Sequence, residues 1–210
     1  SEVVLLVGLS GSGKSTYLSN NNFTDIHSTN RIGLHDNYEI ISVDNILSKG
    51  KLNYNSIDYK KNVKKAFDQT MKDMLEAIKK DKNVIIDMTN LDKENRRRKL
   101  SKFPSSKYHK KAIVFLNGIN EIKSNLLKRE DKKIPESVIF EQMLNFELPN
   151  YDEFDEIQFI GHDSVGKEKN EAHYSNGYIY FGDGSRLYSS SSVNCIGDLV
   201  YDNARTIKGI

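Results

Sequence analysis

The chain has 210 residues and a mass of 24.0 kDa, the size of one domain with a small appendage. A hydrophobic fraction of 37%, a charged fraction of 29% and a mean hydropathy of -0.60 predict a soluble, folded protein. The 31 Lys and Arg against 29 Asp and Glu leave a net charge of +2, so any polyanion site must come from local asymmetry. The single cysteine, Cys195, excludes an internal disulfide and a cysteine-based zinc site.

Five short aliphatic runs have the pattern of strands that are buried on both faces of a parallel sheet. Helical spacing fills several of the intervals between them: apolar residues recur every three or four positions from Val63 to Ile78. This alternation predicts an α/β fold in which helices flank a central parallel sheet. The strands are expected at 3–7, 39–43, 83–87, 111–116 and 156–160, and further helices at 92–103, 121–129 and 135–146.

After about residue 161, charged helix formers give way to Gly, Ser, Tyr and Asn. Asn176-Gly177 lies between two tyrosine-containing runs, which is the signal of a hairpin with a type I′ turn. Further turns are expected at 182–184 and 189–192. We therefore predict a main domain over 1–161 and a small β-rich appendage over 162–210. The longest apolar run, Val3–Val7, is too short to span a bilayer, so we expect a cytosolic protein without a membrane partner.

Residues 8–16 read G-L-S-G-S-G-K-S-T and fit G-x-x-x-x-G-K-[ST], the phosphate-binding P-loop. Its glycines let successive backbone N–H groups turn toward phosphates, and the helix that follows adds the positive end of its dipole. Lys14 is expected to span the β- and γ-phosphates of ATP, and the Ser15 hydroxyl to bind Mg²⁺. The predicted nucleotide-binding residues are Gly8, Ser10, Gly11, Ser12, Gly13, Lys14, Ser15 and Thr16.

A P-loop alone does not separate kinases from GTPases and motors. The guanine-reading Asn-Lys-x-Asp element is absent, and the chain is short for the extra domains of most ring-forming motors. These two observations favour an ATP-dependent kinase with a short lid. The alternative is that residues 8–16 have only a structural role, as a glycine-rich turn between strand and helix that binds no ligand.

Two aspartates stand where predicted strands end. Asp44 follows the second strand, beside the P-loop strand, and is a candidate to accept the proton of an acceptor hydroxyl. The alternative is that Asp44 caps the helix beginning near Asn45. Asp87 closes the third strand and is a candidate Mg²⁺ ligand. Thr89 and Asn90, which follow, are expected to point a hydroxyl and an amide toward the acceptor in the same cleft.

Charge is unevenly distributed along the rest of the chain. Residues 93–111 hold nine Lys and Arg against Glu94 alone, a net of +8, whereas 145–163 hold six acids and no base, a net of -6. This segregation fits a polyanion docking on one side, with Arg96 and Arg97 as candidate acceptor contacts. On its own, a basic helix is more often a solvated face. Farther on, Arg129 lies in a basic connection between two helices, where it could meet the charge on the transferred phosphoryl group. The alternative is a charged helix–helix connection.

The ordered set of motifs resembles the polynucleotide 5′-hydroxyl kinase family, which includes phage enzymes and the kinase half of the animal 5′-kinase/3′-phosphatase. The matching pieces are Gly8–Thr16, Val43-Asp44, 86–90 with the basic helix, Lys128-Arg129 with Ile134-Pro135, and 146–149 leading to 154–157. The resemblance covers roughly residues 2–160. It implies that Asp44 is the general base, that Arg129 is a lid arginine, and that Thr89 and Asn90 lie on the acceptor side.

Two features depart from that family. Leu47 stands where the phage enzymes have an arginine that holds the acceptor's phosphate, and the lid segment is shorter. Three hypotheses follow: transfer of the γ-phosphate of ATP to a nucleic-acid 5′-hydroxyl, transfer to a small-molecule or modified-base hydroxyl, and a nucleotide-dependent nucleic-acid-binding module. In the third, the tyrosines of 162–210 would stack on bases, although ordinary cross-strand packing is the more common role of such residues. The lysine- and asparagine-rich usage is in keeping with an AT-rich genome, such as that of a virus.

Overall fold

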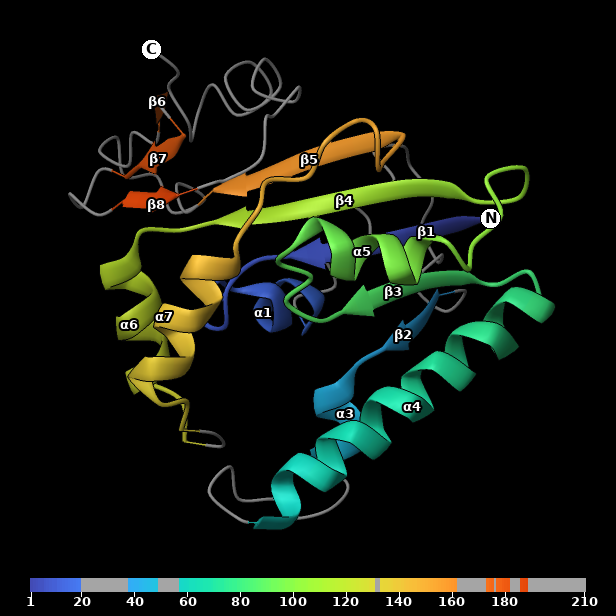
Figure 1. The fold of residues 1–210 in the computed structure, drawn as a ribbon, viewed down its shortest axis with the longest axis horizontal. Helices are drawn as coiled ribbons and strands as arrows, with labels where there is room; N and C mark the ends of the chain where they lie inside the picture. Colours follow the sequence, from blue (N-terminus) through green and yellow to red (C-terminus); the bar gives the residue numbers. More distant parts are fainter. Residues whose placement is uncertain are drawn as a thin grey trace.

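The computed structural model describes residues 1–19, 38–48, 57–130, 133–161, 173–175, 177–181 and 186–188. Five parallel strands form the central sheet in the order β2-β3-β1-β4-β5 (Figure 1). The predicted fold class is confirmed. The strands are β1 (Glu2–Val7), β2 (Tyr38–Ile41), β3 (Asn83–Asp87), β4 (His109–Leu116) and β5 (Glu156–Gly161).

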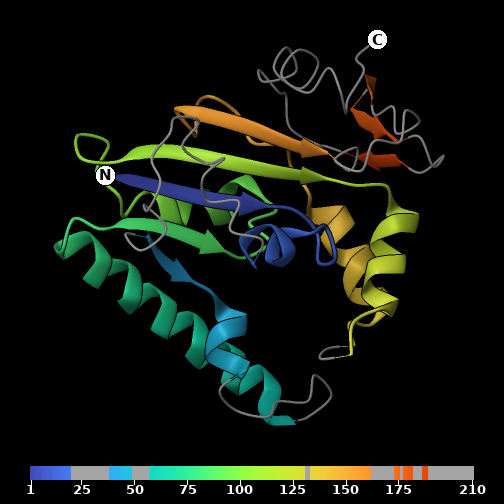
Figure 2. The same ribbon diagram turned by 180° about the vertical axis from the view of Figure 1, so that it is seen from behind.

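Helices lie on both faces of this sheet. Figure 1 shows α5 in front of the strands, and Figure 2, from behind, shows α1 in front of them. Among the described residues, no helix combines the length and apolar character needed to cross a bilayer. The helices are α1 (Lys14–Ser19), α3 (Val43–Ser48), α4 (Ile57–Lys79), α5 (Lys93–Leu100), α6 (Ile119–Leu127) and α7 (Glu136–Asn145).

Alternate residues of each strand face opposite sides of the sheet, which is why the strands read as continuous aliphatic runs. Val3, Leu5 and Val7 are buried in the larger core, together with residues of α4, α5, α6 and α7. Val4 and Leu6 are buried on the other side, where Tyr17 of α1 packs edge-on against Phe115 of β4. Both cores meet at β1, the central strand, so the loop that follows β1 starts from the middle of the sheet, where both faces are covered.

Strand and helix boundaries differ from the sequence-based expectation mainly at their ends. The second strand was expected to reach residue 43 but ends at Ile41, because Ser42 begins a helix: its Oγ accepts a hydrogen bond from the Asn45 N–H at 3.3 Å. The third strand was predicted with its observed bounds. The long helix α4 begins at Ile57, six residues before the apolar repeat.

The predicted C-terminal β structure is a three-stranded antiparallel sheet of β6 (His173–Ser175), β7 (Tyr178–Tyr180) and β8 (Arg186–Tyr188). Ser175 pairs with Tyr178, and Gly177 has a φ of +83°, as a type I′ turn requires. Ile179 and Leu187 are buried in the larger core. The turns expected at 182–184 and 189–192 lie outside the described residues, and the boundary at 161/162 stays a prediction.

Candidate nucleotide-binding and phosphoryl-transfer site

The P-loop connects β1 to α1 at the carboxyl edge of the sheet. β1 separates β2 and β3 on one side of the sheet from β4 and β5 on the other. In open parallel sheets, ligands bind at such a point, where the strand order changes direction. The Gly8 N–H donates to the Thr89 carbonyl at 3.0 Å, which ties the start of the loop to the end of β3. Gly11 and Gly13 have φ angles of +82° and +97°. A Cβ on Gly11 would lie 3.0 Å from Leu126 Cγ and 3.1 Å from the Ile122 carbonyl oxygen, so this position also lacks room for a side chain.

Lys14 begins α1 and is buried within the loop. Its Nζ donates to the carbonyl oxygens of Gly8 and Leu9, each at 2.8 Å. The lysine ammonium is therefore enclosed by the phosphate-binding motif itself. The next two residues, Ser15 and Thr16, are exposed.

Three charged side chains converge beside the P-loop. Burial raises the pKa of the Asp87 carboxyl, the nearby Lys14 ammonium opposes this by lowering it, and the Asp44 carboxylate raises it further. The charges of Lys14 and Asp44 therefore both affect the pKa of Asp87. The structure brings together the lysine and the two aspartates that the sequence singled out separately.

The donor set offered by Ser15 and Asp87 suits Mg²⁺, because a hydroxyl and a carboxylate are oxygen ligands of the kind that this ion prefers. Asp87 also stands at the end of β3, half-buried, where a cation would offset the burial that raises the pKa of its carboxyl. A bound Mg²⁺ would supply charge neutralisation of the phosphates.

Asp44 occupies the first turn of α3 and is exposed. The capping alternative does not hold for it, because the side chain that bonds the first-turn Asn45 N–H is Ser42. One expectation needs correction: β2 does not lie beside β1, since β3 pairs with both strands and separates them. Asp44 is near enough to Asp87, at the end of β3, for its charge to raise the pKa of that carboxyl.

Asn90 is placed differently from the expectation. It is 2% exposed, has a φ of +47°, and its Nδ2 donates to the carbonyls of Leu6 at 2.7 Å and Ile86 at 3.2 Å. Its amide joins the ends of β1 and β3 inside the fold, and its Oδ1 accepts from Lys99 Nζ at 2.5 Å. Thr89 contributes its carbonyl to the P-loop and is half-buried.

The expectation that Arg96 contacts an acceptor is wrong. Its side chain is fully buried and pairs with Glu153 at 2.8 Å, while its Nη1 donates to three backbone carbonyls. The guanidinium is fully used inside the fold. Arg97 is exposed and pairs with Glu94 at 2.7 Å, and the two arginines Arg97 and Arg98 hold the pKa of the Glu94 carboxyl down to about 2.

The basic and acidic segments do not lie on separate sides of the molecule. They lie against each other, because β4 and β5 are neighbouring strands and 150–156 runs past α5. Contacts between them include the ion pairs Lys93–Asp152, Arg96–Glu153 and Lys111–Glu156, and the bond from the Lys110 N–H to Asp155 Oδ2. Much of the local net charge of +8 is therefore neutralised within the fold, and counting along the chain overestimated the polyanion surface.

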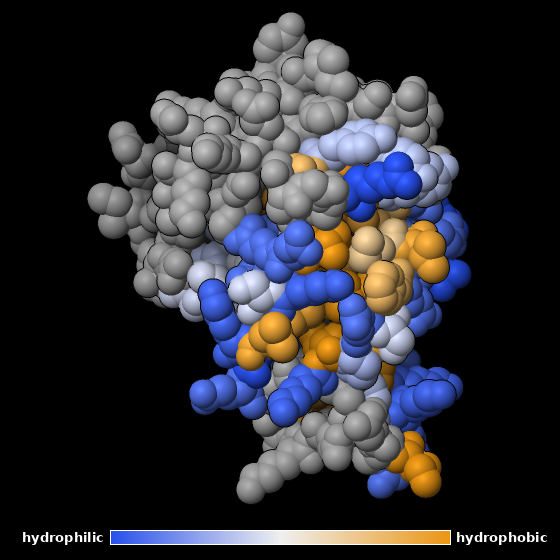
Figure 3. Space-filling model, turned by 90° about the vertical axis from the view of Figure 1, so that its left-hand side faces the viewer, coloured by the Kyte–Doolittle hydropathy of each residue, from blue (hydrophilic) through white to orange (hydrophobic). Residues whose placement is uncertain are grey.

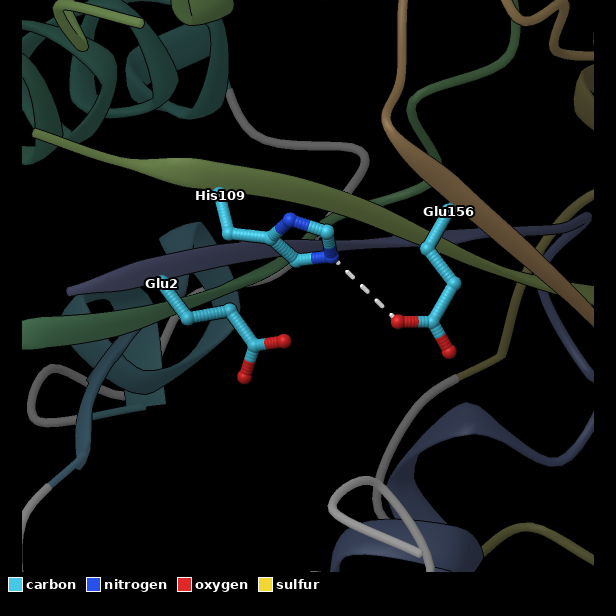
Figure 4. Close-up of side chains that lie close together, drawn as sticks. All are labelled: Glu2, His109 and Glu156. Atoms are coloured by element: carbon cyan, nitrogen blue, oxygen red, sulfur yellow. Dashed lines mark hydrogen bonds and ion pairs between the residues drawn. The ribbon is translucent and has the colours of Figure 1, made fainter. Parts of the chain in front are cut away.

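Figure 4 shows a second charged group at the opposite, amino-terminal edge of the sheet, made of Glu2, His109 and Glu156. The His109 Nε2 lies 3.3 Å from Glu156 Oε2. Glu2 accepts from the Tyr38 hydroxyl at 2.6 Å, and Glu156 Oε1 pairs with Lys111 Nζ at 2.8 Å. These carboxylates are thus already paired within an ion-pair cluster, on the far edge from the P-loop.

The predicted lid residue, Arg129, follows α6, and its backbone N–H donates to the Leu126 carbonyl at 3.3 Å. Two residues that the sequence analysis missed, Asn125 of α6 and Gln142 of α7, contact the P-loop by hydrogen bonds. No motif marks either residue. Figure 3 views the face on which α6 and α7 lie, where apolar surface gathers among hydrophilic side chains. Leu127, Phe140 and Leu144 are exposed on these helices.

The tyrosines of the C-terminal sheet pack against one another. Tyr178 and Tyr188 are cross-strand partners with ring centroids 5.2 Å apart, and the Arg186 guanidinium lies 4.4 Å from the Tyr178 ring centroid. This is the ordinary packing that the sequence analysis favoured over base stacking.

A parallel sheet with a P-loop at its carboxyl edge, between β1 and a helix, defines a P-loop nucleotide-binding protein of kinase-like fold. Residues 3–149 match the family described as AAA domain, and the chain belongs to that family. Three solved structures of similar fold each cover more than three quarters of the chain.

Among these structures is Kti12 of Chaetomium thermophilum in complex with ADP-AlF3, with a TM-score of 0.54 and 18% identity over 77% of this chain and 89% of that chain. A putative kinase from Chloroflexus aurantiacus has a TM-score of 0.55 and 11% identity over 79% and 87% of the two chains. The PezAT toxin–antitoxin system of Streptococcus pneumoniae has a TM-score of 0.53 and 15% identity over 94% and 76%. At such identities the likeness shows the fold.

Proposed function

We propose that this protein transfers the γ-phosphate of ATP to a hydroxyl acceptor, with the P-loop holding the triphosphate and Asp44 accepting the hydroxyl proton. The observation that carries the proposal is that Lys14, Asp44 and Asp87 stand at the carboxyl ends of the parallel strands β1, β2 and β3, where the charges of the first two shift the pKa of the third. In-line transfer needs positive charge on the phosphates and a base beside the incoming hydroxyl. In this scheme Lys14 neutralises the transferred group, Ser15 and Asp87 hold Mg²⁺, and Arg129 of the lid meets the developing charge.

The first candidate acceptor is the 5′-hydroxyl end of a nucleic acid. Its support is the ordered set of motifs shared with polynucleotide 5′-hydroxyl kinases, including the lid and the segment that follows it. The exposed Arg97 is the remaining α5 candidate for contact with a phosphate of the acceptor strand.

A small-molecule hydroxyl is the second candidate, and a specific observation favours it. Arg96 is buried, Lys93 and Arg97 are paired with acids, and Leu47 is apolar. Each of these reduces the positive surface available to a polynucleotide.

The decisive experiment incubates labelled ATP and Mg²⁺ with a 5′-hydroxyl oligonucleotide, with its 5′-phosphorylated twin, and with nucleosides and sugars. Label transfer to the first alone supports the nucleic-acid acceptor, and its loss with rising salt would show that phosphate contacts contribute. Transfer to a nucleoside or sugar alone supports the second candidate. Absence of transfer to every hydroxyl compound, with ATP still bound, would refute a phosphotransferase role.

A further inference from the structure

Residues outside the P-loop motif hold its backbone in place. Gln142 of α7 accepts from the Ser10 N–H through Oε1 at 2.9 Å and donates through Nε2 to Ser10 Oγ at 2.9 Å. A carboxamide has an oxygen that accepts and a nitrogen that donates, and Gln142 uses both atoms to bond the same residue, Ser10. The Ser10 N–H is thereby directed toward α7.

The neighbouring P-loop residues are held from the same side. Asn125 of α6 donates to the Gly11 carbonyl at 3.0 Å. In the amide orientation that satisfies both of its polar atoms, Asn117 donates to the Ser12 carbonyl at 3.1 Å. Three consecutive P-loop residues are therefore bonded to amide side chains of the segment that runs from β4 to α7.

The helices α6 and α7 both contact the P-loop, through Asn125 and Gln142 respectively. Gly11 has no room for a side chain because Leu126 and the Ile122 carbonyl of α6 approach it directly. A change in the shape of the P-loop would therefore displace its contacts with α6 and α7.

We infer that Gln142 is a positioning residue, which preorganises the P-loop for the phosphates of ATP and couples the loop to α7, with Asn125 assisting. A loop already held in its binding shape loses less entropy when the ligand arrives, which strengthens binding. Because such coupling is reciprocal, bound ATP stabilises α7 in return. The inference rests on nucleotide binding by the P-loop and is independent of the acceptor.

The primary test replaces Gln142 by methionine, which has a similar length and makes neither hydrogen bond. Affinity is measured by calorimetric titration with Mg²⁺ and a non-hydrolysable ATP analogue. We expect about a tenfold loss for Gln142→Met, the size that removal of a pair of hydrogen bonds produces. The matched control is Gln69→Met on α4, where the lost partner is Asp73, and the affinity should stay within twofold. An unchanged affinity for Gln142→Met, or an equal loss for Gln69→Met, overturns the inference.

A second variant guards against a failure of Gln142→Met to fold. Ser10→Ala removes one of the two hydrogen bonds, and we expect about a threefold loss of affinity. The double variant Ser10→Ala/Gln142→Met should bind no more weakly than Gln142→Met alone, since both changes remove the same contact. Fully additive losses would contradict the pairing.

Hydrogen exchange separates positioning from a general loss of stability. In the unaltered protein, the ATP analogue should slow amide exchange within 136–145, and in Gln142→Met this protection should disappear although the protein stays folded. Equal protection in both proteins would overturn the coupling to α7. Because none of these measurements needs an acceptor, their failure is distinguishable from a failure of the proposed transfer reaction.

Discussion

Arg96 and Glu153 form a bidentate ion pair in the interior of the protein. The Nε–Oε1 and Nη2–Oε2 distances are 2.8 and 3.1 Å, and the two side chains are 0% and 4% exposed. The third nitrogen, Nη1, donates to the carbonyls of Asn90, Leu91 and Glu147. The pair thus joins the end of β3, the helix α5 and the segment that leads into β5.

Removing one partner of this pair should be costly. In Glu153→Ala the guanidinium stays buried without its counter-charge, so we expect the free energy of unfolding to fall by about 3–5 kcal/mol. Urea denaturation measures this. The matched control, Arg97→Ala, breaks an exposed pair that solvent screens, so the stability should stay nearly unchanged. Similar losses in the two variants would show that Arg96 is not held as described.

The proposed role of Asp44 predicts a separation of chemistry from binding. Asp44→Asn should slow phosphoryl transfer by roughly 10²–10⁴, the usual range for a lost general base, because an amide cannot take up the proton. ATP affinity should be nearly unchanged, since Asp44 is exposed on α3 and lies outside the P-loop. Single-turnover kinetics and nucleotide titration make the comparison. A loss of ATP binding would instead point to a structural or metal-binding role.

Two glycines of the P-loop provide a matched pair. Both have positive φ angles, so Gly13→Ala should cost about 1–2 kcal/mol of stability through backbone strain. Gly11→Ala should cost more, because its Cβ would also press on Leu126 and the Ile122 carbonyl, whereas the position of a Cβ at residue 13 is open. Thermal unfolding of both variants tests the difference. Equal losses would argue against close packing of α6 on the loop.

Lys99 predicts a pH dependence of stability. It is 6% exposed and donates to the side-chain oxygens of Asn90 and Asn95, and burial lowers the pKa of its ammonium to about 8. The unfolded chain, with an ordinary lysine pKa of 10.5, then binds more protons than the folded one between about pH 8 and 10.5. The cost of burying the charged ammonium of Lys99 is fully present below about pH 8. It is relieved as the pH rises toward 10.5, which raises the free energy of unfolding by at most about 3 kcal/mol.

Urea denaturation at pH 7.5 and at pH 10 is compared with the same measurement on Lys99→Met. The variant lacks the titrating group, so its stability should rise less, or fall more, over this interval than that of the unaltered protein. Parallel pH profiles in the two proteins would contradict the lowered pKa of Lys99.

The sheet could be predicted from the sequence because its strands are buried on both faces and therefore read as uninterrupted aliphatic runs. Asn83–Asp87 was predicted to the residue. The P-loop could also be recognised from the sequence, because its glycines and lysine are required at fixed spacing. The hairpin at Asn176-Gly177 followed from the turn geometry that these two residues favour.

The rest depended on partners that are distant in sequence. Arg96 pairs with a glutamate 57 positions away, and no local pattern distinguishes a buried arginine from the exposed Arg97 beside it. Asn90 was expected at the acceptor, yet its amide bonds the carbonyl of Leu6, 84 positions earlier. Gln142 is one polar residue on an amphipathic helix, and only the packing of α7 against the loop reveals its contact with Ser10.

The parallel strands place the ion-pair cluster of Glu2, His109 and Glu156 at one end and the P-loop at the other. Five residue steps of β1 separate the two ends by roughly 17 Å. A reporter dye or a surface tether attached at the cluster would therefore stay clear of a bound nucleotide. That edge offers a natural handle for immobilising the protein in single-molecule or biosensor work while its opposite end remains accessible to ligands.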